Sequence, residues 1–337
     1  MRTSDDAASD RDPLDRDHVI FQSRAGHQHN GVMSDAPDVV AVVGPTASGK
    51  SGLALALAER FGGEIVNADA FACYIGMDIG TAKPSPDDRQ RTPHHLIDVW
   101  EVEHDLSVAE YQQRARAVVD DIRARGRVPI VVGGSGLYVR ALLEPLEFPG
   151  TNADVRAHFA LRLDDIGPAA LHAELAEIDP AAAAAILPTN GRRIVRALEV
   201  VTMTGRPFVA QLPGTAAVYP DIRIGLDVQR PMLDARIDAR VAEMFTAGFA
   251  DEVAGLEPRL RRARTAARAV GYAELLDYLS GSMSLDEART ATATATRRLA
   301  RRQMTWFRRD ARVEWLQGTG VEVIDQATSA VALRLGA

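Results

Sequence analysis

Val39–Phe61 reads VVAVVGPTASGKSGLALALAERF, and this stretch decides the fold. Its first five residues are apolar and mostly β-branched, a pattern typical of a strand that is buried on both faces of a parallel sheet. Gly44–Ser51 matches G-x-x-x-x-G-K-[ST], and the alanines and leucines that follow predict a helix from Lys50 to Phe61. A strand, a glycine-rich loop and a helix in this order predict a phosphate-binding loop, or P-loop.

The chemistry of this loop follows from its residue types. Glycines let backbone N–H groups converge on an anion, and the start of the helix adds its positive end. Lys50 offers a mobile cation, and the Ser51 hydroxyl is placed to hold Mg²⁺, which we expect as the cofactor. The predicted phosphate contacts are Gly44, Pro45, Thr46, Ala47, Ser48, Gly49, Lys50 and Ser51.

Strand and helix patterns alternate on both sides of the loop. We expect strands at 64–68, 95–99, 128–132 and 222–228, and a long helix at 108–125. This alternation predicts an α/β fold, a P-loop NTPase-like parallel sheet flanked by helices, with a small helical insertion domain. Near the end of the chain, RVEWL (312–316) and VEVID (321–325) predict a closing strand pair or a single late strand.

The same patterns divide the chain into four segments. Residues 1–37 are rich in Asp, Ser, His and Gly and predict a disordered tail, and 38–145 form the first part of the P-loop core. Residues 146–213 form the helical insertion, with helices expected at 154–164, 169–178 and 190–203. Residues 214–337 complete the core and carry basic helices, the last of which opens at Ser284 with a capping box.

Composition limits the class of protein. The chain has 337 residues, a formal net charge of −7 and one cysteine, Cys73, so no disulfide framework is possible within it. A chain without disulfides fits a reducing cytoplasm, so we expect a cytoplasmic protein, and we expect it to be a monomer. No apolar run is long enough to cross a bilayer, so we expect no membrane partner. Basic residues nevertheless crowd the C-terminal third, so the total charge hides a possible basic face. They are Arg259, Arg261, Arg262, Arg264, Arg268, Arg297, Arg298, Arg301, Arg302, Arg308 and Arg309.

A second group of reactive residues follows the other strands. Asp69 comes at the end of the strand 64–68, and GGSGLY (133–138) comes at the end of the strand 128–132. Because the carboxyl ends of parallel strands meet at one edge, we expect Asp69, the P-loop and GGSGLY to face one crevice. That arrangement suits a carboxylate acting as general base beside a bound diphosphate. The strand 128–132 carries no Asp at its end, which disfavours a hydrolytic NTPase.

Several motifs together closely resemble the tRNA dimethylallyltransferases, the tRNA delta(2)-isopentenylpyrophosphate transferase family. They are GPTASGKS, ADAFACYIGMDIGTAKP, GGSGLYVRALL, NGRRIVRALEV, TGRP, AVGY and TRRLARRQMTWFRRD, in this order from about Val39 to Leu316. The resemblance implies transfer of a dimethylallyl group from dimethylallyl diphosphate to N6 of adenosine 37 in tRNAs that read codons beginning with U. The P-loop would then hold a leaving group, and the partner would be the anticodon stem-loop of tRNA.

The resemblance also implies roles for individual residues. Asp69 matches the general base, and with Ser135 and Lys50 it forms the predicted catalytic set; Arg240 resembles an arginine near the diphosphate, with Arg236 as a rival. Ser135 stands where the family usually has Thr, Ala72 where it often has Gln, and Arg192 at a common Gln position. The predicted tRNA contacts are Asp69, Ala70, Phe71, Ala72, Ser135, Arg156, Arg192, Arg193, Arg196, Arg268, Gly271 and Tyr272.

Two other classes of function remain open from the sequence. A P-loop small-molecule kinase would place ATP in the loop, and ATP-only turnover would support it. A non-catalytic tRNA-binding module would be unaffected, in both binding and any activity, by replacement of Asp69 with Ala.

Overall fold

The computed structural model describes residues 38–208 and 216–336. Six parallel strands form its sheet in the order β3-β2-β4-β1-β5-β6. The predicted α/β fold is thus confirmed. The strands are β1 (Val39–Val43), β2 (Glu64–Asn67), β3 (His94–His95), β4 (Pro129–Gly133), β5 (Asp221–Asp227) and β6 (Val313–Gln317).

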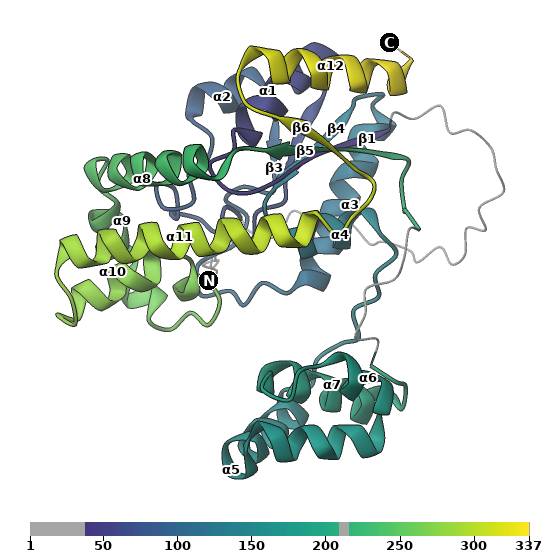
Figure 1. Cartoon of the computed structure of the whole chain (residues 1–337), viewed down its shortest axis with the longest axis vertical. Helices are drawn as coiled ribbons and strands as arrows, with labels where there is room; N and C mark the ends of the chain where they lie inside the picture. Colours follow the sequence, from purple (N-terminus) through teal and green to yellow (C-terminus); the bar gives the residue numbers. More distant parts are fainter. Residues whose placement is uncertain (1–37, 209–215, 337) are drawn as a thin grey trace, which may run out of the picture. The chain divides into compact units, whose positions relative to one another are not determined.

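The central strand β1 is buried throughout, as its unbroken apolar sequence predicts. Its alternate residues serve two hydrophobic clusters, one on each face of the sheet. One face is covered by α1 (Lys50–Phe61) and α12 (Val321–Leu335), which pack against each other (Figure 1). The other face is covered by α3 (Val108–Ala124) and α4 (Gly136–Leu143), whose residues join the larger cluster.

Four helices lie between β5 and β6, and the basic residues noted in the sequence lie on them and on the turns that follow them. The helices are α8 (Arg230–Thr246), α9 (Phe249–Leu260), α10 (Tyr272–Leu279) and α11 (Leu285–Phe307), with a 3-10 turn at Ala266–Arg268. The capping box at the start of α11 forms as predicted, because the Ser284 hydroxyl accepts from Glu287 N–H and the Glu287 carboxylate accepts from Ser284 N–H. α11 runs beside α8 and α10 (Figure 1).

Between α4 and β5 the described chain is helical. α5 (Ala153–Ile178), α6 (Pro180–Ala185) and α7 (Gly191–Thr204) enclose a hydrophobic cluster of their own. Gly167 leaves the helical conformation (φ 78°, ψ 167°) before Pro168, so α5 is two helical pieces, which matches the two helices expected at 154–164 and 169–178. The 1–37 tail and the predicted end of the insertion at 213 lie outside the described residues.

One strand prediction is wrong, and of the two alternatives stated for the end of the chain the single late strand is confirmed. Only His94–His95 pairs in the predicted strand 95–99, because Leu96 (φ 62°) and Asp98 (φ 56°) adopt left-handed conformations. VEVID lies in helix α12, and the late strand is β6 alone. Val323, Ala327 and Val331 recur every four residues and pack on the sheet, so helical burial overrides the short alternating pattern. The sequence analysis also missed α2 (Pro86–Arg91), α4 and α6.

Candidate functional site

Three loops meet at the carboxyl edge of the sheet because β2, β4 and β1 are neighbours. The segment after β2 touches the turn after β4: the Ala70 N–H donates to Ser135 Oγ at 3.4 Å. The two chains approach so closely that a Cβ on Gly133 would lie 2.2 Å from the Ala68 carbonyl oxygen, so only glycine fits there. Two sides of the expected crevice, the segment after β2 and the turn after β4, are therefore in contact.

The P-loop has the backbone of an anion cradle. Gly44, Ala47 and Gly49 have positive φ values of 135°, 62° and 99°, so the loop turns back on itself before α1 begins. The Lys50 ammonium donates to the Pro45 carbonyl at 2.5 Å and so lies over its own loop. Ser48 Oγ is buried and has no hydrogen-bond partner in the part of the chain that the structure describes, which leaves a polar atom in the loop free for a ligand.

Electrostatics joins three predicted site residues. Burial lowers the pKa of Lys50 to about 7; the charge of Asp69 opposes this shift and that of Arg240 adds to it. Burial also lowers the pKa of Arg240. Charges act on the Lys50 pKa in this way only from nearby, and Ala47 of the P-loop packs in one cluster with Ile237 and Val241 of α8. The ends of β1 and β2 and the helix α8 therefore contribute to one site. An anion here would meet two cations whose charge the protein alone does not fully neutralise.

Asp69 is held in a defined orientation. Its Oδ1 accepts from the Phe71 N–H at 2.9 Å, and its own N–H donates to Asn67 Oδ1 at 3.0 Å. The Asn67 amide also donates to the Asp69 and Leu96 carbonyls, so a buried side chain fixes the turn. Oδ2 of Asp69 accepts no hydrogen bond from the described residues and is free to take a proton from a substrate.

Few side chains of the described residues at this site could bind a metal ion. No group of three His, Cys, Asp or Glu side chains that could hold a metal occurs in 38–208 and 216–336. The predicted metal ligand Ser51 is exposed at the start of α1. This fits Mg²⁺, which keeps several waters and is commonly held by one or two protein groups together with substrate phosphates.

The predicted tRNA contacts after β2 and before α10 differ in exposure. Ala70, Phe71 and Ser135 are partly exposed, Arg268 is exposed, and Ala72 is buried. The side chain of Tyr272 is fully buried and its hydroxyl donates to Glu252 at 2.5 Å, so this side chain is not accessible to tRNA. The predicted tRNA contact at Tyr272 stays a prediction, and the phenol ring of this residue is part of the hydrophobic core.

The predicted tRNA-contacting arginines of the helical insertion differ in their ion pairing. Arg156 and Arg196 both donate to the carboxylate of Glu199, whose side chain has no exposed surface. Arg196 also donates to the Pro149 and Gly150 carbonyls. Arg196 therefore anchors residues 149–150 to α7, and Arg156 joins α5 to α7 through Glu199. Arg192 and Arg193 are exposed on the first turn of α7.

Ion pairing also separates the basic residues of the C-terminal third. Arg259 and Arg262 pair with Glu103, Arg261 pairs with Glu257, and Arg264 lies near Asp105. Arg297 pairs with Asp238 and Arg308 with Asp227. Of the eleven arginines noted in the sequence of this third, five are exposed and have no ion pair or side-chain hydrogen bond within the described residues, and we call them the open arginines: Arg268, Arg298, Arg301, Arg302 and Arg309.

Two residues near the site carried no signal that the sequence analysis used. Glu252 on α9 accepts the N–H groups of Asp78, Ile79 and Gly80 as well as the Tyr272 hydroxyl. Gln303 on α11 accepts the Thr46 N–H of the P-loop at 2.8 Å. A signal existed for Gln303, since it falls on the stripe Ala300, Gln303, Phe307 that α11 buries.

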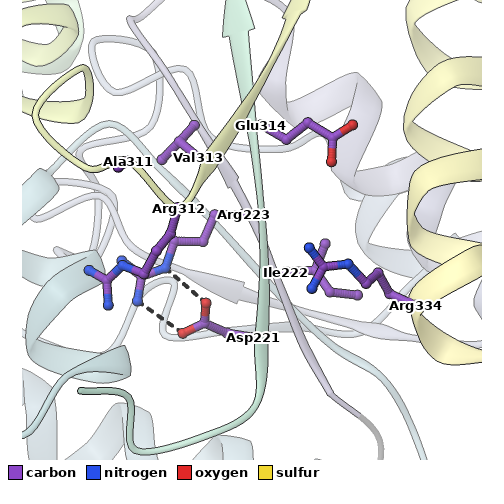
Figure 2. Close-up of a pocket in the computed structure, with 8 residues that line it drawn as sticks. All are labelled: Asp221, Ile222, Arg223, Ala311, Arg312, Val313, Glu314 and Arg334. Atoms are coloured by element: carbon purple, nitrogen blue, oxygen red, sulfur yellow. Dashed lines mark hydrogen bonds and ion pairs between the residues drawn. The ribbon is translucent and has the colours of Figure 1, made fainter. Parts of the chain in front are cut away.

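A cavity of about 370 Å³ lies away from this edge. Figure 2 shows its lining at the beginnings of β5 and β6, where the Arg223 guanidinium pairs with Asp221. Strand beginnings lie at the opposite edge of a parallel sheet from strand ends. Arg223 is also paired with the buried Glu144 and with Asp310, so its charge is already compensated.

The sequence matches known proteins over most of its length. A family model described as IPP transferase matches residues 72–310. The tRNA dimethylallyltransferase of Streptomyces coelicolor is 58% identical over 284 residues, which cover 84% of this chain and 91% of that protein. The tRNA dimethylallyltransferase of Thermobifida fusca is 56% identical over 299 residues, covering 87% of this chain and 94% of that protein.

Solved structures give the same result. The full-length tRNA isopentenylpyrophosphate transferase of Bacillus halodurans superposes with a TM-score of 0.67 at 38% identity, covering 89% of this chain and 97% of that one. A eukaryotic dimethylallyltransferase acting on tRNA superposes with a TM-score of 0.76 over 89% of this chain and 79% of that one, and at 23% identity it supports the fold alone. Within the described ranges, no helix is both long and apolar enough to span a bilayer.

Proposed function

The chain belongs to the IPP transferase family, and from this premise we propose that it transfers the dimethylallyl group of dimethylallyl diphosphate to N6 of adenosine 37 in tRNAs reading codons that begin with U. The products are N6-isopentenyladenosine and diphosphate. The observation that carries the proposal is the proximity of Asp69 and Arg240 to Lys50 at the P-loop, where the charges of both act on the Lys50 ammonium and α8 packs on the loop. It brings two cations for a leaving diphosphate and one carboxylate for an attacking amine to the same place.

The reaction follows from what these side chains can do. The P-loop N–H groups, Lys50 and Arg240 bind the diphosphate and stabilise the negative charge that grows on it as the allylic C–O bond breaks. The N6 amine forms the new C–N bond, and its proton passes to the free Oδ2 of Asp69. Ser135 Oγ, which accepts from Ala70 N–H, keeps the Asp69 turn against the turn after β4.

The base must leave the anticodon stack to reach this crevice, as base-modifying enzymes require. We propose that Ala70 and Phe71 at the rim receive it, and that the open arginines bind phosphates of the anticodon stem-loop. Such contacts fix the position of the RNA and carry little sequence information. Arg192 and Arg193, on the exposed turn of α7, give the helical segment 146–213 a place in tRNA binding.

We propose Mg²⁺ as the cofactor, held by Ser51 Oγ, diphosphate oxygens and water. Bound there, it would neutralise charge on the leaving diphosphate. An exposed hydroxyl and the absence of a carboxylate cluster in the described residues suit an ion that arrives with its substrate. Because every proposed catalytic group comes from one chain and the acceptor is tRNA, we propose a cytoplasmic enzyme that acts as a monomer.

The test compares two donors on unmodified tRNA. Wild-type protein should incorporate label from radiolabelled dimethylallyl diphosphate, and Asp69→Asn should lower the rate about 10² to 10⁴-fold with tRNA affinity unchanged, which is the usual contribution of a general base. Asp120→Asn, a substitution on α3 away from the site, is the matched control. Turnover with ATP alone would instead favour a kinase, and normal transfer by Asp69→Asn would remove Asp69 from the mechanism.

A further inference from the structure

Gln303 lies where the long basic helix α11 meets the P-loop. It is 8% exposed and is one of few buried polar residues of the described chain. Its neighbours Arg301 and Arg302 are exposed and belong to the open arginines. One turn of α11 thus carries cations toward solvent and an amide toward the interior. A helix that moves as a rigid rod would pass a displacement of the arginines on to this amide.

The Gln303 amide touches two of the loops that form the site. Its Oε1 accepts the Thr46 N–H at 2.8 Å, a bond between residues 257 positions apart in the sequence. Its Nε2 lies against the turn after β4, because a Cβ on Gly134 would fall 2.3 Å from it. Gly134 has room only for hydrogen there, and any larger side chain would displace the amide. Gln303 therefore lies between the loop of Lys50 and the turn of Ser135.

The position of Thr46 makes this contact important for anion binding. Thr46 lies in the cradle between Gly44 and Gly49, and the backbone path there decides where the loop's other N–H groups point. A hydrogen bond from outside the loop fixes that path before a ligand arrives. Preorganised donors of this kind cost no rearrangement when the anion binds.

From these contacts we propose that Gln303 is a positioning residue that couples RNA held on α11 to the geometry of the diphosphate cradle. The inference rests on the proposed function, because it takes the anticodon arm as the ligand of the open arginines. The free protein already makes the Gln303–Thr46 bond. RNA bound to α11 restricts the motion of this helix, so the bond stays formed for more of the time and the cradle binds diphosphate more tightly. By thermodynamic linkage, bound diphosphate strengthens RNA binding by the same factor.

The experiment measures binding of inorganic diphosphate with and without a saturating anticodon stem-loop RNA. Wild-type protein should bind diphosphate more tightly when RNA is present. Gln303→Ala should weaken diphosphate binding about tenfold, the size of one lost hydrogen bond, and should remove the effect of RNA while RNA affinity itself stays unchanged. Thr305→Ala, an exposed position on the same helix whose hydroxyl bonds only to the Arg301 carbonyl, is the matched control.

A second variant tests the contact itself. Gly134→Ala should reproduce the Gln303→Ala phenotype, because the new methyl group displaces the amide. In the Gln303→Ala background the same substitution should add no further loss, since the shortened side chain leaves room for the methyl group. If Gln303→Ala does not fold, Gln303→Met, which has similar length and no amide, takes its place.

Three results would overturn the inference: no effect of RNA on diphosphate binding in the wild type, an unchanged effect in the Gln303 variant, or additive losses in the double variant. Prenyl transfer by the same wild-type preparation separates this failure from that of the proposed function. If the wild type transfers the prenyl group and Gln303→Ala leaves the effect of RNA on diphosphate binding unchanged, then only the role of Gln303 is wrong. If Gln303→Ala abolishes the effect of RNA that the wild type shows, and the wild type transfers no prenyl group, then the role of Gln303 stands and the proposed reaction is wrong.

Discussion

Replacing Glu252 with Ala should destabilise the protein strongly, although this residue lies outside the reacting groups. Its carboxylate accepts N–H groups from Asp78, Ile79 and Gly80 at 3.0, 2.7 and 3.2 Å, and the Tyr272 hydroxyl at 2.5 Å. Burial, followed by the Glu252 charge, raises the pKa of the Tyr272 hydroxyl well above its ordinary value. The carboxylate thus holds the turn that follows the Asp69 segment to α9 and α10.

The size of the loss follows from the groups left unpaired. A buried hydroxyl without a partner costs about 1–3 kcal/mol, and hydrogen bonds to a charged acceptor contribute about 1.5–3 kcal/mol each but share one carboxylate here. Water can replace the bond to the exposed Asp78. We therefore expect a loss of about 3–5 kcal/mol in the free energy of unfolding. At about 2 °C per kcal/mol for a chain of this size, Tm should fall by about 6–10 °C.

Urea denaturation of the full chain measures this loss. Glu257→Ala, on the same helix, is the control, because its surface pair with Arg261 should contribute less than about 1 kcal/mol. Tyr272→Phe should be much less costly in the Glu252→Ala background than alone, since the hydroxyl has already lost its acceptor. Equal stabilities of the two glutamate variants, or additive effects of Glu252→Ala and Tyr272→Phe, would refute the reasoning.

Three further predictions concern charge. The hydrogen bond from Arg125 lowers the pKa of Glu64 from 4.5 to about 2; burial opposes this shift and His95 adds to it. The stability that this carboxylate contributes is therefore complete above pH 4.5, and about 3 kcal/mol of it is lost as the pH falls toward 2. Urea titrations at several pH values should show this loss in the wild type and not in Glu64→Gln. Arg302→Glu should weaken RNA binding and reduce its salt dependence by about one ion, measured by filter binding, whereas Arg259→Glu, already paired in the wild type, should change both much less. Glu199→Gln should raise amide hydrogen exchange in α5 and α7 and leave the sheet protected, because the buried carboxylate anchors two arginines of that segment alone; faster exchange in β1 would contradict this.

The phosphate loop and its partner carboxylate were predictable from the sequence because both depend on local order along the chain. A buried strand followed by GPTASGKS needs no distant residue to adopt its turn, and Asp69 follows a strand that must end at the same edge. The site roles assigned to Lys50, Asp69 and Ser135 remain predictions that the transfer assay tests. The fold class and the family are confirmed.

Distant contacts explain what the sequence could not show. Whether an arginine is open or paired depends on acids far away in the chain, as Arg259 with Glu101 and Glu103 illustrates. The same holds for Tyr272, whose exposure is decided by packing against Phe249 at a ring distance of 5.0 Å.

The sequence by itself determined the anion cradle, the carboxylate beside it and the family, because short-range backbone geometry and strand order decide them. Only the tertiary structure decided which arginines remain unpaired within the described residues, that Glu252 holds the turn after Asp69, and that Gln303 joins α11 to the P-loop. The physical reason is that a hydrogen bond or ion pair depends on distance in space, and one-dimensional patterns record distance only along the chain.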